Sequence, residues 1–149
     1  LGLETPTESD RELIQELLAL MASNECDFTL FFRELSHLAA TPDDDRGIDA
    51  FLPGSGEWKD WHQRWVARLS QEPMSPAERS TQMLRTNPAI IPRNHLVERA
   101  IQQMESGDSS LFHALLEDFR DPFTPERDHS AHTRPPEDSE KVTRTFCGT

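Results

Sequence analysis

The residues that could do chemistry in this chain are six histidines, two cysteines and many carboxylates. His129 and His132 have the spacing of a metal-binding pair, but Cys147 is distant and a fourth ligand at compact spacing is missing. A structural zinc ion needs four such ligands. We therefore predict no metal site, and we interpret the histidines as solvated or half-buried side chains.

Carboxylates occur in two runs, at 43–45 and at 137–140. Acid–base catalysis needs carboxylates whose environments separate their pKa values, whereas runs on connectors and tails are usually solvated. The sequence also has no glycine-rich phosphate loop, no nucleophile elbow and no kinase-type lysine motif. We therefore predict that this stretch contains no catalytic residue.

Two apolar features are candidates for docking against a partner. Trp58, Trp61 and Trp65 recur at helical spacing, with Arg64 and Arg68 nearby. An aromatic cage or a base-stacking platform could use such rings, but large rings bury much area, so packing in a core or an interface is the favoured interpretation.

The second feature is a proline-bracketed connector at 87–94, which contains Ile90 and Ile91 and ends in Arg93 and Asn94. It is too apolar for a free loop, so we predict that it docks, together with part of the tryptophan helix. The alternative is that Asn94 caps a helix and Arg93 lies at the surface.

Helical patterns position these residues. Apolar side chains recur at three- and four-residue spacing in six stretches, which lie within 13–21, 28–38, 58–69, 76–84, 94–104 and 108–119. Predicted starts and stops are the capping boxes at 5–8 and 75–78, the caps Asp27 and Asn94, and Gly107. We predict an all-α fold, an irregular bundle of about six helices over 1–120. A proline-rich, mostly irregular tail at 121–149 is extended and a candidate for disorder.

Charge and hydropathy limit the partners. The net charge is −12, from 27 acidic and 15 basic residues, and such a surface repels phosphate backbones and anionic lipids, so we predict neither nucleic acid nor membrane as a partner. No apolar run is long enough for a bilayer, no secretory signal is present, and two cysteines do not make a disulfide scaffold. We therefore predict a cytoplasmic protein. Because the sequence starts at Leu1 without a methionine, we expect a part of a longer polypeptide.

Six segments together resemble the C-terminal region of one known family. They are 27–35, the helix at 58–65, 87–95 (Asn-Pro-Ala-Ile-Ile-Pro-Arg-Asn-His), Gly107-Asp108 with its leucine-rich helix, 121–123, and 145–149 (Thr-Phe-Cys-Gly-Thr). The family is selenoprotein O (SelO, YdiU). The resemblance runs along essentially the whole chain, and the segment at 87–95 and the Cys-Gly-Thr end are its specific parts.

The resemblance implies more than this chain contains. Members have a protein-kinase-like fold that holds ATP in an inverted orientation and transfers AMP to protein hydroxyls. Their phosphate- and metal-binding residues lie in the kinase-like region, which would precede Leu1, so no catalytic role is carried over. ATP and Mg²⁺ are expected for the full-length parent only. The expected partners are the parent's own kinase-like domain and, through the parent, protein substrates.

Cys147 is the residue to which the resemblance assigns a role. It matches a position held by selenocysteine in some animal members and by cysteine in bacterial ones, which implies a bacterial member. A disulfide from Cys147 to a second thiol, with Cys26 as one candidate, would tether the tail and couple activity to redox state. We therefore predict a structural and redox-regulatory helical domain; the alternative is a stand-alone all-helical module that binds a basic or apolar protein.

Overall fold

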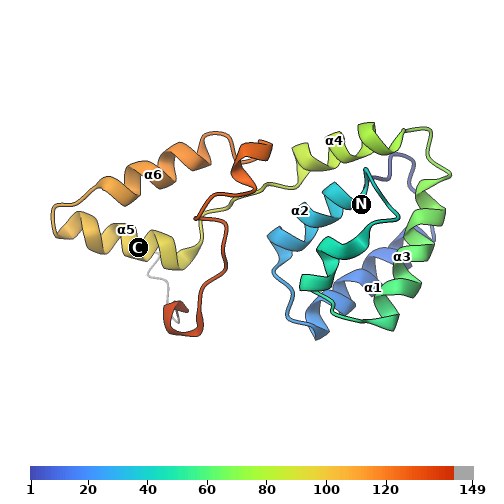
Figure 1. The fold of residues 1–149 in the computed structure, drawn as a ribbon, viewed down its shortest axis with the longest axis horizontal. Coiled ribbons are helices and arrows are strands. Elements are labelled where there is room, and N and C mark those ends of the chain that lie inside the picture. Colours follow the sequence, from blue (N-terminus) through green and yellow to red (C-terminus); the bar gives the residue numbers. More distant parts are fainter. Residues whose placement is uncertain (143–149) are drawn as a thin grey trace. The chain divides into compact units, whose positions relative to one another are not determined.

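A computed structural model describes residues 1–142, and all regular structure in this part is helical (Figure 1). The α-helices are α1 (Asp10–Ser23), α2 (Phe28–Leu38), α3 (Gly56–Leu69), α4 (Pro76–Thr86), α5 (Asn94–Glu105) and α6 (Ser110–Phe119). Three short 3₁₀ helices are η1 (Asp45–Ala50), η2 (Pro125–Arg127) and η3 (Asp138–Glu140). The predicted all-α fold of about six helices is confirmed. None of these helices is long and apolar enough to cross a bilayer.

The chain divides into two compact units, Leu1–Asn87 and Pro88–Thr149, here called unit 1 and unit 2. Unit 1 contains α1 to α4 and η1, and unit 2 contains α5, α6, η2 and η3. The boundary falls at the start of the proline-bracketed connector. Residue 120, where the predicted helical domain ends, follows directly after the last residue of α6.

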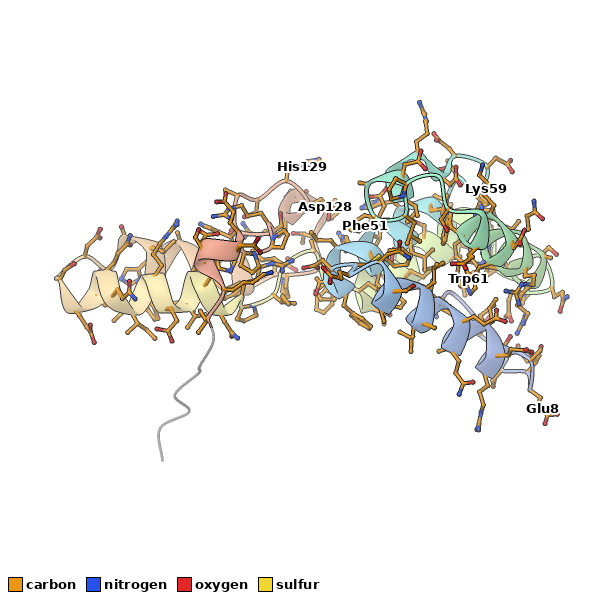
Figure 2. All side chains as sticks on the ribbon, turned by 90° about the horizontal axis from the view of Figure 1, so that it is seen from below. Glu8, Phe51, Lys59, Trp61, Asp128 and His129 are labelled. Atoms are coloured by element: carbon orange, nitrogen blue, oxygen red, sulfur yellow. The ribbon has the colours of Figure 1, made fainter. Side chains whose placement is uncertain are left out.

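Unit 1 is built around the three tryptophans of α3. Their rings stack in a row, with centroids 5.4 Å apart for Trp58–Trp61 and 5.8 Å apart for Trp61–Trp65. Figure 2 shows Trp61 among the helices of unit 1, with Glu8 at the edge. The indole N–H groups donate to Asp45 Oδ2 (3.0 Å, from Trp58), the Leu13 carbonyl (2.8 Å, from Trp61) and the Leu1 carbonyl (3.0 Å, from Trp65). Because these donors are satisfied, the rings are buried without a polar penalty.

Two of the predicted helix caps in unit 1 form. Asp27 accepts a hydrogen bond from the Leu30 amide at 3.0 Å and begins α2. Ser75 and Glu78 form the reciprocal capping box that begins α4, with proline at the first helical position. These short-range patterns therefore predict the helix starts correctly.

The capping box predicted at 5–8 is wrong. α1 begins at Asp10, and its N-cap makes no side-chain hydrogen bond. The Glu72 carboxylate accepts the N–H groups of Glu4 and Thr5, each at 3.2 Å. Glu72, which follows α3, thus holds the backbone of residues 4 and 5. This segment lies before α1 and is not helical.

Unit 2 begins with a hairpin of α5 and α6. Its core contains Leu96, Ala100 and Leu115, with Leu111 and Phe119 packed against them. Gly107 has φ 93°, the left-handed conformation that favours glycine after a helix. The predicted stop at this position is confirmed.

The segment after α6 is organised by the buried carboxylate of Asp118. This carboxylate accepts hydrogen bonds from Arg127 Nη1 (2.6 Å), Ser130 Oγ (2.8 Å) and the His132 ring at Nδ1 (2.7 Å). Burial raises the pKa of Asp118, but the bonds from His132 and Ser130 and the charge of Arg127 outweigh it, so the pKa is lowered. The described part of the proline-rich tail therefore folds through specific polar contacts.

Candidate functional site

The connector predicted to dock leads into α5. The Ala89 amide donates to the Pro122 carbonyl at 2.8 Å, which ties the connector to the segment after α6. Ala89 and Ile90 are buried, and Ile91 is half-buried. Ile90 therefore has little surface left for a partner, whereas Ile91 keeps part of its side chain accessible.

An open cavity of about 550 Å³ lies at the N-terminal end of α5. Its walls come from the connector, the first turn of α5 and the residues at η3, and include Ile91, Arg93, Asn94, His95, Glu140 and Lys141. Asn94 is the first helical residue, and the N-cap is Arg93, which makes no side-chain capping bond. The prediction that Asn94 caps this helix is therefore wrong.

Charged side chains surround this cavity. Arg134 donates two hydrogen bonds to the Glu140 carboxylate, at 2.6 and 2.7 Å, and Arg99 Nη1 lies 3.9 Å from the same group. The bonds from Arg134 lower the pKa of Glu140 to about 2. Arg93 is 8% exposed, so the alternative that places it at the surface does not hold in this structure.

His95 lies in the same wall and is 7% exposed. Its Nε2 atom is buried and has no hydrogen-bond partner among the described residues. Burial lowers the pKa of the ring; the Glu140 charge acts against this, and the charges of Arg134, Arg93 and Arg99 add to it. A neutral imidazole with unused hydrogen-bonding capacity thus lies among guanidinium groups.

A second cavity, of about 470 Å³, lies beside α3 in unit 1 and is lined in part by Asp43, Asp45 and His62. The His62 ring stacks on Trp58, with centroids 5.1 Å apart and planes at 12°, and burial lowers its pKa. Asp45 accepts the Trp58 indole N–H. In residues 1–142, no group of three or more His, Cys, Asp or Glu side chains is arranged to hold a metal ion.

The other predicted site residues lie in different surroundings. Trp58, Trp61 and Trp65 are 2%, 2% and 0% exposed, so their rings are part of the core of unit 1 and leave almost no surface for a partner. Cys147 lies outside the described residues. Cys26 is half-buried, and burial raises the pKa of its thiol, which disfavours the reactive thiolate.

Sequence periodicity missed a buried ion-pair cluster around Arg68, which lies 2.7 Å from both Asp10 and Glu72. A signal was present. Arg68 follows Trp61 by seven residues and Trp65 by three, so it lies on the same face of α3 as these rings. A charge on a buried face needs partners of opposite charge. Asp10 is 58 positions away along the chain, and no sequence pattern distinguishes Glu72, four positions after Arg68, from other acidic residues.

Comparison with known proteins assigns the chain to a family. The family model described as protein adenylyltransferase SelO matches residues 1–120. The chain belongs to the SelO family. The SelO match covers unit 1 and the α5–α6 hairpin, including the connector and the N-terminal end of α5, and it confirms the predicted family.

Relatives in the SelO family share the name protein nucleotidyltransferase YdiU. The chain is 42% identical over 149 residues to the protein of Nitrobacter hamburgensis, 46% over 158 residues to that of Agrobacterium fabrum, and 43% over 150 residues to that of Rhizobium leguminosarum bv. trifolii. Each comparison covers 100% of this chain and 30% of the relative. The chain thus spans about 30% of the length of these SelO relatives.

Proposed function

We propose that this chain is the C-terminal helical domain of a SelO-type protein adenylyltransferase, with a structural and a redox-regulatory role. The full-length enzyme transfers AMP from ATP, with Mg²⁺, to Ser, Thr or Tyr hydroxyls of proteins and releases pyrophosphate. The observation that carries the proposal is that the whole chain aligns with nucleotidyltransferases but covers only 30% of each. The nucleotide-binding residues belong, in this proposal, to the remaining part.

The structural role is docking against the kinase-like region of the same polypeptide. On each of three helices, two exposed apolar residues lie three or four positions apart and therefore on the same face. These pairs are Ile14 and Leu18 on α1, Ile101 and Met104 on α5, and Phe112 and Leu116 on α6, all 41–46% exposed. With Ile91 and Asn94, which keep accessible surface, they are better docking candidates than the buried tryptophans and the buried Arg93, because a partner can reach them.

The activity is tested with ATP labelled in its α-phosphate. The full-length protein and the 149-residue chain are each incubated with this ATP, Mg²⁺ and cell extract, and proteins that become labelled are counted on a denaturing gel. We expect label only with the full-length protein. Label transferred by the chain alone would contradict the placement of the chemistry, and no label with the full-length protein would contradict the adenylyltransferase activity.

The redox role is proposed for Cys147. Its thiol and a second thiol in the kinase-like region would form a disulfide, releasing two protons and two electrons to an oxidant such as hydrogen peroxide, which is reduced to water. In the full-length protein, Cys147→Ser should abolish an oxidant-dependent shift on a non-reducing gel and the accompanying change of activity. Cys26→Ser is the matched control and should keep both. If the Cys147→Ser protein still shows both, the thiol has no regulatory role.

A further inference from the structure

The hairpin of α5 and α6 in unit 2 carries large apolar side chains that its own core does not cover. Four of them are 41–46% exposed, namely Ile101, Met104, Phe112 and Leu116. The core beneath them is small, and its buried members are Leu96, Ala100 and Leu115. Exposed apolar residues that lie together mark a surface that another element covers. The first question is therefore whether these four side chains lie together.

Helical geometry places all four on one side of the hairpin. Successive residues are about 100° apart around a helix, clockwise when viewed from its N-terminal end. On α5, Met104 and Ile101 follow the core residue Ala100 by about 40° and 100°. On α6, Phe112 and Leu116 follow the core residue Leu115 by about 60° and 100°. Because α5 and α6 pack side by side in opposite directions (Figure 1), clockwise from the core is the same side for both.

The two helices therefore present one continuous apolar surface, here called the hairpin face, which consists of Ile101, Met104, Phe112 and Leu116. Its edge on α5 is acidic. Glu98 and Glu105 are seven positions apart and lie about 40–60° beyond Ile101, so both border the hairpin face. Near its edge on α6, Arg120 pairs with Glu117 at 2.9 Å. A partner that covers this surface would therefore be apolar in the middle and basic along the edge next to α5.

We propose that one amphipathic helix from the rest of the full-length protein covers the hairpin face. This inference rests on the proposed function, and it names the element that docks. The surface of two antiparallel helices has a groove between them, into which the side chains of a third helix fit. That helix would carry apolar residues at three- and four-residue spacing, and Lys or Arg opposite Glu98 and Glu105.

Two observations favour an occupant from the same polypeptide. The chain covers only 30% of each relative, so about 70% of such a protein lies outside it. A tethered segment has a high effective concentration and needs little affinity of its own. A second copy of the chain would bring its own net charge of −12, which opposes self-association.

The first test is photo-cross-linking in the full-length protein. A benzophenone amino acid replaces Met104 in one variant and Phe112 in another, and mass spectrometry locates the cross-linked peptides. We expect both positions to reach the same stretch of the same molecule, with apolar residues at helical spacing and at least one Lys or Arg. Gln102, which lies on the opposite side of α5 and is exposed, is the control position and should not reach this stretch.

Three results would overturn the proposal. Met104 and Phe112 could reach unrelated stretches or none, the shared stretch could lack helical periodicity or basic residues, or the product could have twice the mass of the protein. The last result would show that a second copy covers the hairpin face.

The second test needs no substitution, so it is decisive even if the cross-linking variants do not fold. Hydrogen peroxide oxidises accessible methionine side chains, and Met104 is 46% exposed. Met104 should be oxidised about fivefold or more slowly in the full-length protein than in the 149-residue chain. Met83, 2% exposed in the core of unit 1, is the internal control and should react slowly in both. Equal rates for Met104 in the two proteins would contradict the proposal.

Neither measurement uses ATP, so this inference and the proposed activity can fail separately. A full-length protein that transfers AMP but leaves Met104 reactive would contradict only the docked helix. A protein with a protected Met104 and no AMP transfer would contradict only the adenylyltransferase activity.

Discussion

A single buried guanidinium, that of Arg68, holds the first residues of the chain against α3. It pairs with Asp10 and Glu72 at 2.7 Å each and donates to the Thr5 carbonyl at 2.5 Å. Glu72 in turn accepts the N–H groups of Glu4 and Thr5. Removing Arg68 would leave both carboxylates buried without a cation, so the two pairs depend on this one side chain.

The cluster predicts acid sensitivity of unit 1. The hydrogen bond from Arg68, which is the largest effect, lowers the pKa of Asp10 from 3.8 to about 2. A carboxylate with a lowered folded-state pKa contributes stability that is present above the unfolded value and lost as the pH falls toward the folded one. We therefore expect the melting temperature to fall between about pH 4 and pH 2, more steeply for the wild type than for Asp10→Asn. Equal slopes for the two proteins would contradict this assignment.

Replacing Arg68 should cost more than replacing a neighbouring arginine. Arg68→Leu leaves Asp10 and Glu72 buried without a cation, and we expect a loss of about 3–5 kcal/mol, or roughly 10 °C in melting temperature. Arg64→Leu on the same helix is the control. Arg64 pairs with Glu16 at the surface, and such a pair contributes about 1 kcal/mol or less. Similar losses in both variants, measured by urea unfolding, would show that the buried cluster is not special.

Helix starts show where a local pattern predicts a structure and where tertiary contacts override it. The same Thr/Ser-Pro-x-Glu pattern occurs at 5–8 and at 75–78. Only the second forms a cap, because Glu72 and Arg68 hold the backbone of the first. The difference depends on residues more than sixty positions away, which no short-range pattern contains.

The two patterns therefore predict different mutational effects. Ser75→Ala should destabilise the chain by about 1 kcal/mol, because the amide of Glu78 loses its acceptor and the Glu78 carboxylate loses the Ser75 hydroxyl while it keeps the Ser75 backbone N–H. Thr5→Ala should change stability by less than about 0.5 kcal/mol, because the Thr5 side chain caps no helix. Both values are measured by urea unfolding followed by circular dichroism. A cost for Thr5→Ala equal to that for Ser75→Ala would contradict the observed start of α1.

The exposed face of α6 predicts a difference between the chain and its parent. Phe112 and Leu116 lie on one face and are 41% and 44% exposed. Changing both to Ser should alter the stability of the 149-residue chain by less than about 1 kcal/mol. In the full-length protein it should lower the melting temperature by several degrees if the face is docked. Ala114→Ser, at another exposed position of α6, is the control and should be neutral in both. Equal effects of the double change in both proteins would contradict docking of this face.

Most of the helices could be predicted from the sequence, but their grouping into two units could not. Apolar periodicity and caps such as Asp27 and Gly107 depend on neighbours within one or two turns, so they leave a readable pattern. The Asp118 contacts join residues up to fourteen positions apart through side chains with no periodic spacing. The cavity at α5 was not predicted. The connector was identified by its prolines, whereas the burial of Arg93 and His95 depends on residues around Glu140 that carry no apolar signal.

The two units predict separable stabilities. All three tryptophans lie in unit 1, so tryptophan fluorescence follows unit 1 alone, whereas circular dichroism follows the helices of both. Unit 1 has a large core that contains these rings, and we expect residues 1–87 alone to unfold cooperatively with a fluorescence change.

The core cluster of unit 2 is centred on Leu96, Ala100 and Leu115. This core is small for a segment of about 60 residues, a length at which folding is already marginal. We therefore expect residues 88–149 alone to be partly helical with a broad transition. A broad transition for 1–87, or a sharp one for 88–149, would show that burial in these two cores does not determine their stabilities.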